Sequence, residues 1–106
     1  MKPQQIPEVA VIILNYNGKQ WLEKFLPSVL AHTPTSLAKI WVADNGSTDG
    51  SLEMIKDQFQ GVNTLKMPEN YGFAGGYNHA IKNIPCKYVL LLNSDVEVTE
   101  GWIEPL

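Results

Sequence analysis

Hydrophobic residues form continuous runs at four places along the chain, and each run predicts a β-strand. Residues 9–14 (VAVIIL) are typical of a strand covered on both faces, because every position is apolar. Residues 39–43 (KIWVA) and 88–92 (YVLLL) predict two further buried strands. Residues 62–67 (VNTLKM) predict a weaker strand at the outside of the sheet.

Between these runs, apolar residues recur at the spacing of amphipathic helices. The first such segment covers residues 19–32, and its apolar stripe is predicted to consist of Trp21, Leu22, Phe25, Leu26, Val29 and Leu30. Pro27 lies within it and should kink or end the helix, because proline lacks the N–H that an interior helical position donates. Leu52, Ile55 and Phe59 mark a second helix.

Capping residues and breakers predict where the later helices begin and end. Ser47 or Thr48 is expected to cap the second helix, with Asp49 near the positive end of its dipole. A loop is expected over residues 68–76 (PENYGFAGG), and Pro85 should stop the third helix. The apolar stripe of that helix is predicted to consist of Ala74, Tyr77, Ile81 and Ile84.

Strands that alternate with helices imply βαβ units, so we expect an α/β domain with a Rossmann-like, mostly parallel sheet and flanking helices. Residues 1–8 (MKPQQIPE) are polar, contain two prolines and are expected to form a flexible leader. In such sheets ligands bind beyond the carboxyl ends of the strands. The segments NYNG, DNGSTDG and NSDVE each follow a strand and should converge on that edge.

The composition fits one small globular domain and excludes several classes of protein. The chain has 106 residues, 44% of them hydrophobic, and a net charge of −3. It shows no basic cluster for nucleic acid, no apolar core of a signal peptide and no segment that could span a bilayer. Cys86 is the only cysteine, which favours a reducing compartment and a role in packing.

Asp44 ends the second predicted strand and is open to two interpretations. An ionised carboxylate only accepts hydrogen bonds, which suits the ring N–H of uracil, thymine or guanine. Alternatively, Asp44 starts an Asx-turn over Asn45 and Gly46. Ser47, Thr48 and Asp49 are interpreted as helix caps rather than ligand contacts.

Asp95 and Glu97 follow the last strand and share a face if that strand continues. Two such oxygen ligands suit Mg²⁺ or Mn²⁺ holding a diphosphate, and the alternative is a solvated strand end. Residues 70–78 (NYGFAGGYN) lead into a helix whose N-terminus favours an anion, and close packing of that helix is the alternative. His32 and His79 are expected to be surface or packing residues.

Four segments together resemble the family 2 glycosyltransferases, inverting enzymes of the GT-A fold, and especially the rhamnosyltransferase-like members. They are VIILNYNG, VADNGSTDGS, NYGFAGGYNHAI and LLLNSDVEV. The resemblance covers the chain from Val9 onward. It implies that residues 9–106 are the nucleotide-sugar-binding half of a GT-A domain, truncated before the acceptor-binding half.

The resemblance also implies roles for individual residues. Those expected to bind the nucleotide sugar are Asn15, Tyr16, Asp44, Asn70, Gly72, Gly75 and Asn93. Asp44 would accept from the base. Asn93, Ser94 and Asp95 occupy the position of the D-x-D motif, in which Asp95 would bind the metal and Glu97 is a second candidate ligand.

The implied reaction is direct displacement at the anomeric carbon of a UDP-, dTDP- or GDP-sugar, with a saccharide or lipid-linked acceptor, in polysaccharide biosynthesis. The general base is expected beyond Leu106, so the fragment alone should be inactive. We also expect a cytoplasmic location, in solution or at the cytoplasmic face of a membrane. A homodimer through the surface exposed by truncation is a further expectation.

Two other classes of protein keep a similar half-fold. A non-catalytic nucleotide-binding or interaction module would need no acceptor half. A dinucleotide-binding oxidoreductase is disfavoured because no G-x-G-x-x-G follows the first strand.

Overall fold

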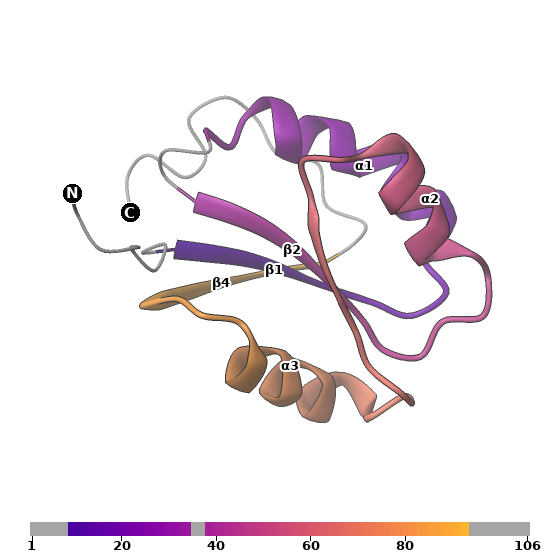
Figure 1. The fold of residues 1–106 in the computed structure, drawn as a ribbon, viewed down its shortest axis with the longest axis vertical. Coiled ribbons are helices and arrows are strands. Elements are labelled where there is room, and N and C mark those ends of the chain that lie inside the picture. Colours follow the sequence, from indigo (N-terminus) through magenta and orange to yellow (C-terminus); the bar gives the residue numbers. More distant parts are fainter. Residues whose placement is uncertain (1–8, 35–37, 94–106) are drawn as a thin grey trace.

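The computed structural model describes residues 9–34 and 38–93, which form a four-stranded sheet with helices on both faces (Figure 1). The strands are β1 (Val9–Asn15), β2 (Ala38–Asp44), β3 (Asn63–Lys66) and β4 (Tyr88–Asn93). They lie in the order β3-β2-β1-β4, and all neighbouring strands are parallel. The predicted α/β class, the parallel sheet and the outer position of β3 are therefore confirmed.

Two helices cover one face of the sheet and the third covers the other (Figure 1). They are α1 (Lys19–Ala31), α2 (Ser51–Gln58) and α3 (Gly72–Asn83). Successive side chains of β1 point to opposite faces of the sheet and so pack in two separate cores. Val11 and Ile13 belong to the core with α1 and α2, whereas Ala10 and Ile12 belong to the core with α3. These helices, of 13, 8 and 12 residues, are too short to cross a bilayer.

Of the two outcomes expected at Pro27, a kink or an end, the helix end does not occur, and the predicted start of α3 was wrong. Helix α1 does not end at Pro27 but continues to Ala31. Pro27 lies on the exposed side, while Leu26 and Val29 beside it are buried, so core packing maintains the helix through the proline. Helix α3 begins at Gly72, inside the predicted loop.

The predicted cap of α2 was also wrong, because the structure uses those residues elsewhere. The N-cap position is Gly50, with φ of +82°, and it makes no side-chain cap. Ser47 Oγ accepts a hydrogen bond from Asn17 N at 2.8 Å, and Thr48 N donates to Asn17 Oδ1 at 2.8 Å. Both residues thus join the loop after β2 to the loop after β1. Asp49 Oδ1 accepts from the backbone N–H at the helix start, 3.0 Å away, as its predicted position near the dipole suggests.

The buried face of α3 and the cover of β4 differ from the sequence pattern as well. Helix α3 buries Gly76, Tyr77 and Ala80, followed by Ile84 at its C-cap. Ala74 and Ile81 of the predicted stripe are exposed instead. Small residues allow α3 to approach the sheet closely, which rotates its buried face toward them. β4 is an edge strand in the sheet of described residues, with partly exposed side chains, and is not covered on both faces like β1.

Candidate functional site

The carboxyl ends of β1, β2 and β4 meet at one edge of the sheet. In the strand register, Asn15 pairs with Asp44, and Leu14 pairs with Asn93. From β1 the chain moves outward to β2 and β3, and then returns to place β4 on the other side of β1. The crevice outside such a reversal of strand order is where open α/β sheets bind ligands.

A pocket of about 490 Å³ opens at this reversal. The residues that line it are Leu14, Tyr16, Trp21, Asn45, Asn70, Gly72, Phe73 and Asn93. Four of the predicted site residues are therefore brought together here, namely Tyr16, Asn70, Gly72 and Asn93. None of the described lining residues carries a charge. The wall offers amides, backbone and aromatic rings.

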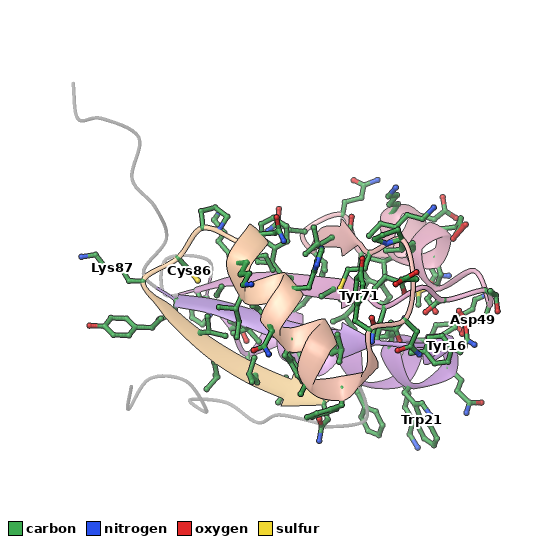
Figure 2. All side chains as sticks on the ribbon, turned by 90° about the horizontal axis from the view of Figure 1, so that it is seen from below. Tyr16, Trp21, Asp49, Tyr71, Cys86 and Lys87 are labelled. Carbon is green, nitrogen blue, oxygen red and sulfur yellow. The ribbon has the colours of Figure 1, made fainter. Side chains whose placement is uncertain are left out.

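Three aromatic side chains of the pocket lie exposed to solvent. Tyr16 is 52% exposed, Trp21 42% and Phe73 69%. Figure 2 shows Tyr16 and Trp21 near one another at one end of the molecule, far from Cys86 at the other end. Exposed rings beside a pocket can stack on a planar ligand, because every such ring has an apolar face.

Asn15 and Asp44 do not line the pocket, because both are buried behind its wall. Asn15 is fully buried and Asp44 is 2% exposed. Asn15 Nδ2 donates to Asp44 Oδ1 at 2.9 Å, and its Oδ1 accepts from Gly18 N at 3.1 Å. Asp44 Oδ2 accepts from Ser47 N at 3.0 Å. Both carboxylate oxygens of Asp44 are therefore bonded within the protein, which supports its turn-forming role.

Asn45, the next residue, holds a second buried network on the pocket side. Its side chain is 2% exposed. Asn45 Nδ2 donates to Asn70 Oδ1 at 3.1 Å and to Gly72 O at 3.0 Å, and Oδ1 accepts from Tyr71 N at 2.9 Å. Asn70 Oδ1 also accepts from Gly72 N at 2.7 Å. The N–H groups of Tyr71 and Gly72 at the start of α3 are thus bonded to side chains rather than to a ligand.

The glycines of the third motif serve packing more than ligand binding. A Cβ on Gly76 would lie 2.8 Å from Asn45 Nδ2 and 2.9 Å from Leu14 Cδ1, so a larger residue there would force one of these side chains to shift. Gly75 lies within α3 and does not line the pocket. Gly72 has φ of +77°, and a Cβ there would meet no atom within 4 Å. The pocket lining is therefore open at Gly72.

The two histidines and the cysteine lie away from the lining of the pocket. His79 stacks on Tyr71 with ring centroids 4.9 Å apart, and His32 is the C-cap of α1. Cys86 packs against the core beside α3, as predicted, and burial raises the pKa of its thiol. No histidine or cysteine is thus placed to serve as a base or nucleophile in the described part of the pocket.

Two further ionisable groups are perturbed near the carboxyl edge. Burial raises the pKa of Tyr77, whose hydroxyl donates to Leu92 O at 3.2 Å and so fixes the end of β4 to α3. Burial alone would raise the pKa of Asp49, but hydrogen bonds from Ser51 and from Lys19 N outweigh it and lower that pKa. Both groups stabilise the protein around the pocket.

The predicted metal ligands Asp95 and Glu97 lie outside the described residues. Among residues 9–34 and 38–93, no group of three or more His, Cys, Asp or Glu side chains could hold a metal ion. Asn93, the first residue of the D-x-D position, does line the pocket.

Sequence reasoning missed half of the pocket lining: Leu14, Trp21, Asn45 and Phe73. Trp21 had been assigned to the buried stripe of α1, and Asn45 to a turn. These four residues lie next to strand ends or helix starts at the carboxyl edge of the sheet, and that position is the sequence signal that could have predicted them as pocket residues.

Comparison with known proteins shows the family of this chain. The family described as glycosyl transferase family 2 matches residues 10–106. An uncharacterized glycosyltransferase of Bacillus subtilis, YfnE, is 35% identical over 92 residues, covering 84% of this chain and 23% of that protein. Glycosyltransferase GlyA of Streptococcus pneumoniae is 29% identical over 101 residues, covering 93% of this chain and 14% of that protein. The chain thus spans less than a quarter of either relative.

Solved structures share the fold at lower sequence identity. TarS 1–349 of S. aureus, in complex with UDP-GlcNAc, superposes with a TM-score of 0.79 at 22% identity, covering 92% of this chain and 29% of that one. The mannosyltransferase PcManGT of Pyrobaculum calidifontis, in complex with GDP-Man and Mn²⁺, gives a TM-score of 0.75 at 22% identity, covering 88% and 29%.

Proposed function

This chain belongs to glycosyl transferase family 2, and we propose that its pocket binds the nucleoside-diphosphate part of a sugar donor. The observation that carries the proposal is the pocket at the reversal of strand order, lined from the ends of β1, β2 and β4. Solved structures of the same fold support it, since TarS binds UDP-GlcNAc and PcManGT binds GDP-Man.

The buried position of Asp44 changes the expected recognition of the base. Asp44 is 2% exposed and each of its oxygens already accepts a hydrogen bond within the protein, so we propose that its carboxylate organises the loops rather than accepting from a ring N–H. We assign recognition instead to stacking on Tyr16 and Trp21 and to the exposed amides of Asn70 and Asn93. We assign Gly75 no direct contact with the nucleotide sugar, because it lies in the first turn of α3 and not on the pocket lining.

The reaction we propose for the parent protein is sugar transfer with inversion, hexosyl or rhamnosyl, to a saccharide or lipid-linked acceptor. Asp95, with Glu97 as a second candidate, would hold Mg²⁺ or Mn²⁺, and PcManGT with Mn²⁺ supports this choice. The metal would offset charge on the leaving diphosphate. Asn93 lines the pocket, where its amide can bond a ribose or phosphate oxygen.

The remaining expectations stay predictions. They are the inactivity of this chain by itself, with the general base beyond Leu106, a cytoplasmic location, and a homodimer. Sedimentation at several concentrations checks the dimer, and a transfer assay with a panel of donors and acceptors checks the inactivity.

Calorimetric titration of the chain with UDP, dTDP, GDP, ADP and CDP tests the donor site, in Mn²⁺ and in excess chelator. We expect binding of at least one of the first three and its weakening by chelator. Asp95→Ala should remove this metal response, while Asp57→Ala, an exposed change on α2, should keep it. Failure of all five to bind would refute the proposed function, and an unchanged metal response in Asp95→Ala would refute the ligand assignment.

A further inference from the structure

We propose that Asn45 is a positioning residue: it fixes residues 69–72, the pocket wall that leads from β3 into α3, and thereby sets how tightly the pocket binds a nucleotide. The part about affinity rests on the proposed function. The part about the wall rests on contacts within the described residues and can be tested without any ligand.

The side chain of Asn45 bonds three successive residues of the wall. Its Nδ2 donates to Asn70 Oδ1 and Gly72 O, at 3.1 and 3.0 Å, and its Oδ1 accepts from Tyr71 N at 2.9 Å. Both N–H donors are thus used, together with one lone pair of the oxygen. A 2% exposed amide with these contacts acts on the wall rather than as a free ligand contact.

The surroundings hold this amide in one place. A Cβ on Gly46, whose φ is +85°, would lie 2.9 Å from Asn70 N and from Glu69 C. A Cβ on Gly76 would lie 2.8 Å from Asn45 Nδ2. The wall therefore packs directly on Gly46, the residue after Asn45, and α3 packs at Gly76 directly on the Asn45 amide. A side chain at position 46 would press on the wall, and one at position 76 would press on the amide and on Leu14.

The chemistry of the network requires an amide rather than a carboxylate. Aspartate at position 45 could still accept from Tyr71 N, but its other oxygen would face two acceptors, Asn70 Oδ1 and Gly72 O. Gly72 O would lose the Asn45 donor, Asn70 Oδ1 would keep only its bond from Gly72 N, and both oxygens would repel the new charge. Since Asn70 and Gly72 line the pocket, any shift of the wall changes the shape that a nucleotide meets.

The test combines amide hydrogen exchange without ligand and titration with UDP and with GDP in Mn²⁺. Asn45→Ala and Asn45→Asp should each speed exchange at Tyr71 by about tenfold or more, with the β1 amides unchanged, because the loss is local. Both should weaken nucleotide binding by about tenfold. Asn83→Ala is the matched control, since Asn83 is exposed and bonds only His79 O, at 2.7 Å. It should change neither quantity by more than about twofold.

Each outcome decides the proposal. If Asn45→Ala does not fold, Asn45→Asp, which keeps the size and the Tyr71 contact, provides the measurement. Unchanged exchange at Tyr71, or faster exchange spread evenly through β1, would overturn the positioning role. Faster local exchange with unchanged nucleotide affinity would overturn the link to binding. If the parent chain binds no nucleotide, the proposed function fails, while the exchange data still decide whether Asn45 holds the wall.

Discussion

Replacing Asp44 with asparagine tests whether this buried carboxylate organises the edge of the sheet. Its two oxygens accept from Asn15 Nδ2 at 2.9 Å and from Ser47 N at 3.0 Å. Both partners are donors, whereas an amide has only one acceptor oxygen. In either orientation, the new NH₂ group would therefore face a donor.

The cost can be worked out from these contacts. One hydrogen bond to a charged group is lost, worth about 1.5–3 kcal/mol, and a donor 2% exposed or less is left unpaired. The two effects overlap, so we expect a loss of about 2–4 kcal/mol in the free energy of unfolding. That is a large share of the roughly 5–15 kcal/mol that stabilises a typical domain.

Urea unfolding followed by circular dichroism measures the loss, and the slope of free energy against urea should stay constant. Asp57→Asn, an exposed change of the same chemistry on α2, should stay within about 0.5 kcal/mol of the parent. A loss below about 0.5 kcal/mol in Asp44→Asn would refute the buried network. If Asp44→Asn kept the stability of the parent but lost a preference for UDP over ADP, Asp44 would instead be the residue that recognises the base.

Three other changes probe the pocket and its support. Trp21→Ala should weaken nucleotide binding by about 1–3 kcal/mol in calorimetry if the indole stacks on the base, and unchanged affinity would exclude that contact. Gly76→Ala should lower the free energy of unfolding by about 1–3 kcal/mol in urea, because its methyl group would press on Asn45; a stabilised variant would contradict the close packing. Burial opposes the shift, but hydrogen bonds, chiefly from Ser51, lower the pKa of Asp49 in the folded protein. Ionised Asp49 therefore stabilises the fold at pH values above its unfolded pKa, and this stability is lost as pH falls through the folded pKa. The difference in melting temperature between the parent and Asp49→Asn should therefore shrink below about pH 4, and a constant difference would contradict this assignment.

The amino-acid sequence by itself determined the α/β class, the four strands and the edge of the sheet where the polar motifs meet. These features follow from local patterns. Residues 9–14 are apolar at every position, which only a strand between two layers accommodates. Polar residues directly after such a run must lie at its carboxyl end, whatever the rest of the chain does.

Tertiary structure decided which of those polar side chains face the pocket. Asn15 and Asp44 have the right chemistry for a ligand, but both are buried, and they bond each other across neighbouring strands as well as N–H groups of their own loops. Asp44 and Asn45 are adjacent and equally buried, yet only Asn45 lines the pocket. The local pattern predicts a turn here, but it does not indicate which of the two side chains faces the pocket.

The same holds for the aromatic side of the pocket. Periodicity placed Trp21 in the apolar stripe of α1, but the core ends before it, and its indole lies at the pocket instead. The extent of a core depends on which other element covers each residue. The hydrogen bonds that organise the neighbouring loops, from Asn15 to Asp44 and Ser47 and from Asn45 to Asn70, likewise join residues 25 to 32 positions apart in the chain. Only the folded arrangement determines them.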